Sequence, residues 1–138
     1  MAEKPIQIHP GGSGLPVREL IIIWLPTVVY VGAIMFMATR PVPKFIHVQH
    51  IDKYLHALAY ALLGGISFYS GTRSKVKHPF LLSFILATVV AGSDEILQSF
   101  THGRVSSFAD FLADVFGILI GNLLSWKLLR DPWQKTPT

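Results

Sequence analysis

The sequence predicts an all-α integral membrane protein built as a four-helix bundle. Its mean hydropathy is +0.46, and 14% of its 138 residues are charged, against about a quarter in soluble domains. Four apolar stretches follow one another along the chain, separated by short links. There is no cysteine, which excludes disulfides and thiolate metal sites. These observations indicate one small membrane domain.

The first two stretches are predicted to be membrane-spanning helices. The first covers residues 20–38, and about 19 helical residues extend ~28 Å, enough for the hydrocarbon core of a bilayer. Pro26 lies inside it and is expected to kink it. The second covers residues 53–70, and it is short and rich in alanine and glycine.

The last two stretches cover residues 79–100 and 108–129. The third begins with Pro79, directly after His78. The fourth follows Ser106 and Ser107, either of which can cap a helix N-terminus. We therefore expect a four-helix transmembrane domain over residues 20–130, a flexible N-terminal arm over 1–19 and a disordered tail over 131–138.

The distribution of lysine and arginine predicts the orientation of the helices. Eight of these residues fall on the side of the termini and four on the other side, and loops rich in Lys and Arg remain in the cytoplasm. The first side holds Lys4, Arg18, Arg73, Lys75, Lys77, Lys127, Arg130 and Lys135, and the second holds Arg40, Lys44, Lys53 and Arg104. We expect both termini in the cytoplasm and a multi-pass protein of the cell inner (cytoplasmic) membrane. The net charge of +4 is thus interpreted as topology, with no nucleic-acid partner.

Five of the eight acidic residues lie inside or at the mouth of the apolar stretches: Asp52, Asp94, Glu95, Asp110 and Asp114. A carboxylate in a bilayer costs several kcal/mol unless it is paired, neutralised or hydrated. Four antiparallel spans would bring all five to one level near the outer interface. Their clustering therefore indicates a polar site facing the outer leaflet.

Helical spacing refines this cluster. Asp52 and His56 are four residues apart and share a face, as Glu95 and Gln98 do at a spacing of three. On the fourth helix the two aspartates continue into a Gly-x-x-x-Gly stripe, a surface typical of close helix packing. We expect Arg104 within ion-pair reach (about 4 Å) of Glu95, Asp94 or Asp110. We also expect Asp52 or Lys53 to face the same cavity.

Three polar strings, in this order and spacing, resemble a known family. They are D-K-x-x-H-x-x-x-Y from Asp52, D-E-x-x-Q from Asp94, and a longer string from residue 103 to Gly121. The last is similar to the pattern G-R-x-x-S-x-x-D-x-x-x-N-x-x-G-x-x-x-G of the VanZ-like family, except that Asp114 replaces the asparagine. The family takes its name from an accessory membrane protein that lowers sensitivity to the glycopeptide teicoplanin. The resemblance implies a fold and a site and does not imply a reaction.

From these observations we expect a non-enzymatic cell-envelope or antibiotic-tolerance factor that binds a membrane lipid or a lipid-linked envelope ligand. Two alternatives stay open, an assembly subunit of a larger membrane-protein complex and a small enzyme acting on a lipid head group. The candidate ligand-binding residues are Asp52, Lys53, His56, Glu95, Gln98, Arg104, Asp110 and Asp114, with Gly117 and Gly121 as helix-packing residues. No metal-specific spacing is present, so the sequence predicts no metal and no other cofactor.

Overall fold

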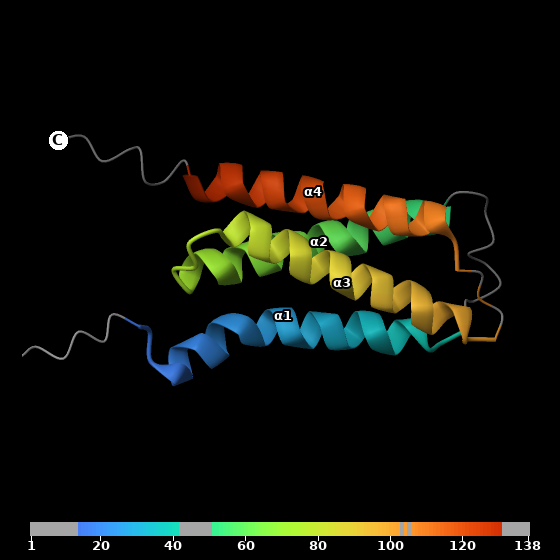
Figure 1. Ribbon diagram of the computed structural model, residues 1–138, viewed down its shortest axis with the longest axis horizontal. Coiled ribbons are helices and arrows are strands. Elements are labelled where there is room, and N and C mark those ends of the chain that lie inside the picture. Colours follow the sequence, from blue (N-terminus) through green and yellow to red (C-terminus); the bar gives the residue numbers. More distant parts are fainter. Residues whose placement is uncertain (1–13, 42–50, 103, 105, 131–138) are drawn as a thin grey trace, which may run out of the picture.

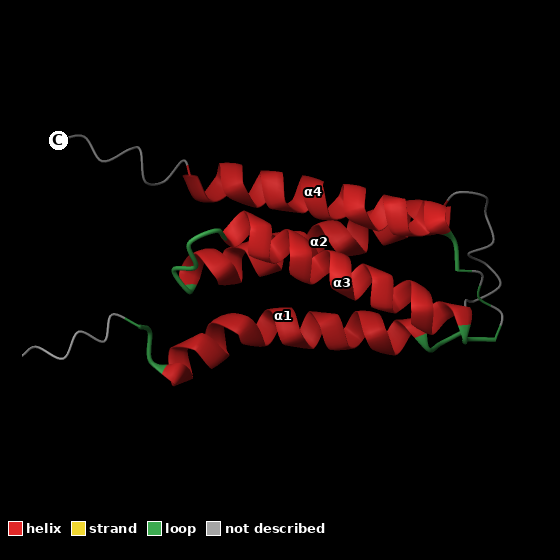
Figure 2. Ribbon diagram, in the orientation of Figure 1, coloured by secondary structure: helices red, strands yellow, loops and turns green. Residues whose placement is uncertain are grey.

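The computed structural model describes residues 14–41, 51–102, 104 and 106–130. These residues form four helices and no strand (Figure 2). The helices are α1 (Val17–Ala38), α2 (Ile51–Arg73), α3 (Pro79–Ser99) and α4 (Phe108–Arg130). Every predicted helix is present, and each end lies within three residues of its predicted position.

The four helices run antiparallel, so α1 begins and α4 ends at the same end of the bundle (Figure 1). The α1–α2 and α3–α4 connections lie at the opposite end. Helix α1 continues through Pro26, and its N-terminal part is inclined to the remainder. Residues 1–13 of the expected arm and the whole expected tail lie outside the described residues, and α1 already begins within the arm at Val17.

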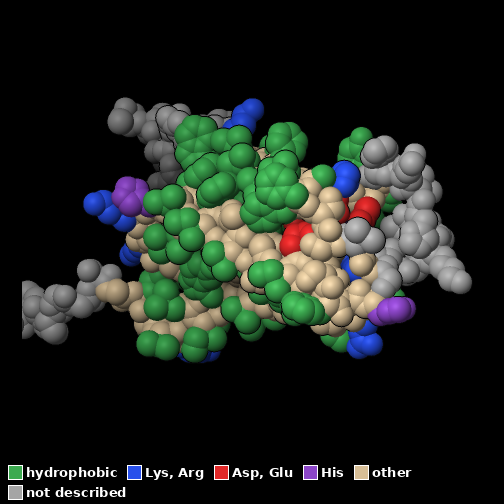
Figure 3. Space-filling view, turned by 45° about the vertical axis from the view of Figure 1, so that its right-hand side comes forward, with side chains coloured by type: hydrophobic (Ala, Val, Ile, Leu, Met, Phe, Trp, Pro, Cys, Tyr) green, Lys and Arg blue, Asp and Glu red, His purple; other side chains and the backbone are tan. Residues whose placement is uncertain are grey.

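Apolar side chains cover the outside of the bundle and polar side chains lie between the helices, as a lipid environment requires. Large apolar side chains such as Val28, Val89 and Phe116 are more than half exposed, whereas serine, asparagine and aspartate side chains are fully buried between the helices. Figure 3 shows hydrophobic side chains over the middle of one face, with Lys and Arg towards its ends. Helices α1, α3 and α4 are each long and apolar enough to cross a membrane.

Helix α2 is less apolar because it is the central element of the bundle. It packs against all three other helices, and its buried face carries small and polar residues, among them Gly64, Ser67 and Ser70. Since other helices cover this face, α2 needs fewer lipid-compatible side chains than its neighbours need.

The closest helix pair is α2 with α4. A Cβ atom added at Gly117 would overlap the carbonyl group of Ala57, and one added at Gly121 would overlap that of Ala61. Small residues spaced by four on both helices thus allow the two backbones to approach closely, as in other membrane helix pairs.

Hydrogen bonds between helices connect the half of the bundle nearer the termini. Ser83 Oγ on α3 lies 2.9 Å from Gly64 O on α2 and 2.8 Å from Asn122 Oδ1 on α4. Thr27 on α1 and Ser70 on α2 are joined through their hydroxyl oxygens, 3.0 Å apart. These neutral contacts join the helices there without any charged group, whereas the Ser67 hydroxyl on α2 is buried and has no hydrogen-bond partner among the described residues.

Candidate functional site

The five acidic residues singled out in the sequence gather at the end of the bundle that is opposite to the termini. The first turns of α2, the last turns of α3 and the first turns of α4 meet there, because the α1–α2 and α3–α4 connections lie at that end. Acidic side chains appear in Figure 3 only towards this end of the face shown. Antiparallel packing thus places residues more than 50 positions apart in one polar cluster.

His56 lies between two carboxylates. Its Nδ1 is 2.9 Å from Asp114 Oδ1 on α4, and its Nε2 is 4.0 Å from Asp52 Oδ1 one turn earlier on α2. Asp114 is completely buried, whereas the Asp52 side chain is about half exposed. The two carboxylates orient the imidazole ring between the bundle interior and its rim.

Lys53 forms an ion pair with Asp110 at the rim of the cluster. The aspartate side chain is buried, and the lysine reaches it from a partly exposed position on α2. This contact joins α2 to α4 and supplies the counter-charge for one buried carboxylate.

Glu95 binds the start of α4. Its Oε2 accepts hydrogen bonds from the Ser106 hydroxyl at 2.7 Å and from the Ser107 backbone N–H at 3.0 Å. Ser107 in turn caps α4, because its hydroxyl oxygen accepts the Ala109 N–H at 3.2 Å. Glu95 therefore positions the segment that delivers the α4 aspartates to the cluster.

The prediction that Arg104 forms an ion pair with an acidic residue is wrong. Arg104 Nε donates to Arg40 O at 3.0 Å, and an Nη donates to Met37 O at 2.9 Å. The last carbonyl groups of a helix have no partner within the helix and carry partial negative charge. The guanidinium group of Arg104 satisfies such groups where α1 ends, and it links the α3–α4 connection to α1.

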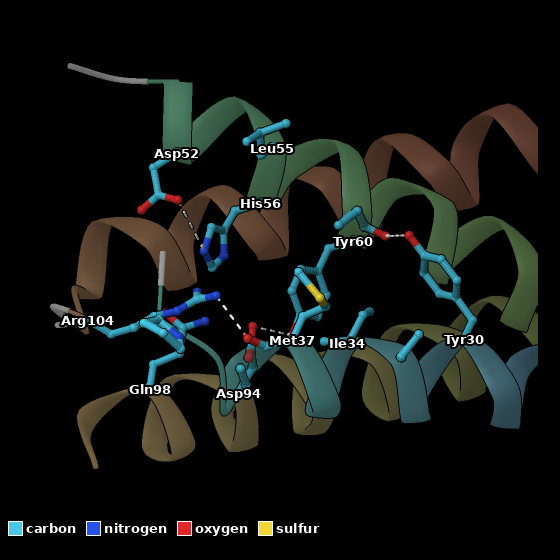
Figure 4. A pocket seen from close by; sticks show the side chains of 14 residues that line it. Tyr30, Ile34, Met37, Asp52, Leu55, His56, Tyr60, Asp94, Gln98 and Arg104 are labelled. Atoms are coloured by element: carbon cyan, nitrogen blue, oxygen red, sulfur yellow. Dashed lines mark hydrogen bonds and ion pairs between the residues drawn. The ribbon is translucent and has the colours of Figure 1, made fainter. Parts of the chain in front are cut away.

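A cavity of about 330 Å³ opens between α1, α2 and α3 beside this cluster. Its polar end is lined by Asp52, His56, Asp94, Gln98 and Arg104 (Figure 4). The expectation that Asp52 or Lys53 would face a common cavity is confirmed for Asp52.

The other walls of the cavity are mostly apolar. Ile34 and Met37 of α1 and Leu55 and Ala59 of α2 line them. The cavity is thus amphipathic, polar at the loop end and apolar along the helices.

Several cavity residues were outside the predicted ligand-binding set, among them Leu55, Ala59 and Tyr60 of α2 and two further groups. The first is Asp94, which accepts a hydrogen bond from the Tyr60 hydroxyl at 3.0 Å. Asp94 and Gln98 are four residues apart and both line the cavity, while Glu95 points to α4. The four-residue spacing from Gln98 is the signal in the sequence that identifies Asp94.

The second group lies on α1 and comprises Tyr30, Ala33, Ile34, Met37 and Ala38. Helical spacing puts them on one stripe. The sequence offers no signal for this stripe, because α1 is apolar on nearly every face.

Three buried carboxylate oxygens have no hydrogen-bond partner among the described residues: Asp94 Oδ1, Glu95 Oε1 and Asp114 Oδ2. Among the described residues, the cluster contains five carboxylates but only two strong bases, Lys53 and Arg104. One base pairs with Asp110 and the other binds backbone carbonyls. Negative charge therefore exceeds positive charge around His56.

Comparison with known proteins gave one match. A family model described as VanZ/LLP1 matches residues 18–130, from the second residue of α1 to the end of α4, and the match includes every residue of the cluster. No curated protein and no solved structure matches the chain.

Proposed function

The chain belongs to the VanZ/LLP1 family, and we propose that it is a cell-envelope factor that binds an amphiphilic, lipid-linked ligand. The amphipathic cavity is the observation that carries this proposal. Its polar end offers a guanidinium group, an imidazole and two carboxylates to a head group, and its walls offer apolar side chains to an acyl or prenyl chain.

Arg104 is the residue that we assign to an anionic head group. A guanidinium group presents several N–H donors in a plane and binds phosphate or carboxylate with two parallel hydrogen bonds. In this protein two of its nitrogen atoms donate to carbonyls of the α1 end, which holds the side chain at the cavity rim. That attachment also fixes the position of the remaining guanidinium N–H donors, so a ligand does not have to immobilise them when it binds.

The proposed location is the cell inner membrane, with the cavity towards the outer leaflet. The excess of Lys and Arg on the side of the termini supports this orientation. The ligands available there are lipids and lipid-linked precursors of the envelope. In that setting the protein would contribute to glycopeptide tolerance by binding such a ligand, without catalysing a reaction.

The test compares two arginine substitutions in a host that lacks its own copy of the protein. Arg104→Gln removes the head-group donor, and we expect loss of glycopeptide tolerance at a near-normal level of membrane-inserted protein. Arg40→Gln is the matched control, because Arg40 lies on the same side of the membrane but its side chain stacks on Phe36, 4.4 Å from the ring centroid, and does not line the cavity. We expect the control to keep the phenotype.

Both variants change the Lys and Arg bias equally, so a difference between them cannot come from topology. Unchanged tolerance in a well-inserted Arg104→Gln strain would remove the ligand-binding proposal and favour the assembly-subunit alternative. Loss of tolerance in both variants would also contradict a role specific to Arg104.

A second candidate function is favoured by the environment of His56. A buried imidazole in contact with a carboxylate, at the wall of a cavity, is the arrangement of a general acid–base pair. The corresponding activity would be a reaction on the head group of a bound lipid. Release of a product from a lipid-linked substrate by the purified protein, lost in His56→Gln, would favour this candidate over binding alone.

A further inference from the structure

Three buried side chains from three different helices meet at the inner wall of the cluster. They are His56 of α2, Asp94 of α3 and Asp114 of α4, and one nitrogen or oxygen atom of each lies within 4.8 Å of the others. Their exposed fractions are 8%, 4% and 0%. None of the three helices could provide this group alone, so the tertiary structure creates it.

Each carboxylate of this group uses one oxygen within the protein and leaves the other without a partner. Asp94 Oδ2 accepts the Tyr60 hydroxyl, and Asp114 Oδ1 contacts His56. Asp94 Oδ1 and Asp114 Oδ2 are buried and have no hydrogen-bond partner. A buried acceptor without a partner carries its full desolvation cost, which is larger for a charged group. Two such oxygens beside one imidazole indicate that a ligand completes the group.

The charges around the group point to a cation. The ammonium group of Lys53 pairs with Asp110, and the guanidinium group of Arg104 binds backbone carbonyls. Asp94 is therefore left without a Lys or Arg partner among the described residues, and the basic side chain beside it is His56. In surroundings of low dielectric constant, two neighbouring carboxylates are stabilised strongly by a single divalent positive charge.

We propose that His56, Asp94 and Asp114 bind a divalent cation of the borderline class, with Zn²⁺ as the best fit. Imidazole suits Zn²⁺, whereas Mg²⁺, Ca²⁺ and Mn²⁺ prefer oxygen ligands. Three protein ligands are also the usual number in zinc sites that retain one open position.

The surroundings fit such a site. At the tetrahedral angle, bonds of about 2.0–2.2 Å place two zinc ligand atoms ~3.3–3.6 Å apart. The three atoms, which lie within 4.8 Å of one another, would therefore approach each other by up to about 1.5 Å. The Tyr60 hydroxyl bound to Asp94 and the Asp52 carboxylate near His56 Nε2 orient the ligands from outside, as partners of metal ligands commonly do. Because His56 and Asp94 also line the cavity, a cation can enter from it and keep its open position there.

The first experiment measures zinc binding by equilibrium dialysis. It uses the full chain in detergent, purified with a tag that contains no histidine. We expect one Zn²⁺ per chain, and affinity at least about tenfold lower in Asp94→Asn and in Asp114→Asn.

Glu19→Gln is the control for this experiment. It also removes one negative charge, but Glu19 is exposed in the first turn of α1, at the end of the bundle opposite to the group. We expect its affinity to stay within about threefold of the unmodified chain, below the change of at least about tenfold expected for the aspartate variants. No stoichiometric zinc in the unmodified protein, or an equal loss in Glu19→Gln, would overturn the proposal.

If the Asp94→Asn and Asp114→Asn variants do not fold, a second measurement tests the proposed metal site. The chain contains six histidines, and the other five can be replaced by asparagine while His56 is kept. Imidazole also suits Cu²⁺, so pulsed electron paramagnetic resonance of this chain loaded with Cu²⁺ should show nitrogen coupling from one imidazole. Bound Cu²⁺ without nitrogen coupling, or no bound Cu²⁺ and no bound Zn²⁺, would refute the site.

Discussion

Substitution of Gly121 by alanine should weaken the pairing of α2 with α4. The added methyl group would overlap the carbonyl group of Ala61, which is backbone and cannot rotate away. The two helices would have to separate along the line where they are closest. Gly92 of α3 provides the matched control, because a methyl group added there meets nothing within 4 Å.

The magnitude follows from the difference between these two variants. Each replaces a helical glycine by alanine, and each gains about 1 kcal/mol of helix propensity. This gain cancels in the comparison. Forcing an extra carbon atom into a well-packed contact costs about 1–3 kcal/mol. We therefore expect Gly121→Ala to be about 1–3 kcal/mol less stable than Gly92→Ala. If the cost is in the upper part of that range, it exceeds the gain in helix propensity, and Gly121→Ala is then also less stable than the unmodified protein.

The assay is reversible unfolding of the purified protein in mixed micelles, with increasing fractions of a denaturing detergent. Both variants and the unmodified chain are followed by circular dichroism. Equal unfolding midpoints for Gly121→Ala and Gly92→Ala would refute the inference that close backbone contact joins α2 and α4. A stabilised Gly121→Ala would refute it more directly.

Two further predictions concern topology and the neutral hydrogen bonds. Reporter fusions after Lys75 and after Lys127 should both report a cytoplasmic location, because the excess of Lys and Arg lies on that side. An extracytoplasmic result for either fusion would place the cluster at the inner face of the membrane and contradict the proposed envelope ligand. Ser83→Ala removes a hydroxyl that lies within hydrogen-bond distance of Gly64 O on α2 and Asn122 Oδ1 on α4. It should lower stability by about 0.6 kcal/mol, the average for such bonds between membrane helices, and by about 1.7 kcal/mol at most. The micelle assay measures it, with Ser93→Ala as the control because the Ser93 hydroxyl binds only the carbonyl of Val89 in its own helix.

Much of the fold could be predicted from the sequence because a membrane-spanning helix can be recognised from the residues of that helix alone. An apolar stretch of sufficient length predicts a span, and the helix ends lie within three residues of the predicted positions. The polar residues that interrupt those stretches are conspicuous for the same reason, since lipid does not accept them. The sequence alone therefore singles out Asp52, His56 and Asp114, together with the stripe that includes Gly121.

The partners of those residues were decided only by the tertiary structure. Helical periodicity tells which residues share a face, but not how two helices are rotated against each other. Arg104 was expected to meet an acid and instead binds the carbonyl groups of Met37 and Arg40, because the end of α1 lies beside it. A backbone acceptor has no signature in the sequence, so this contact could not have been predicted.

Helix α1 is a second example of a feature that the sequence could not predict. Its apolar residues look equally suited to lipid and to a cavity wall, and only packing selects the face with Ile34 and Met37 for the cavity. The group of His56, Asp94 and Asp114 likewise requires three helices at fixed depths and rotations. By itself, the sequence determined that this protein is a membrane-embedded helical bundle with buried charge. The fold decided which charges meet, because distances across a bundle depend on side chains from several helices at once.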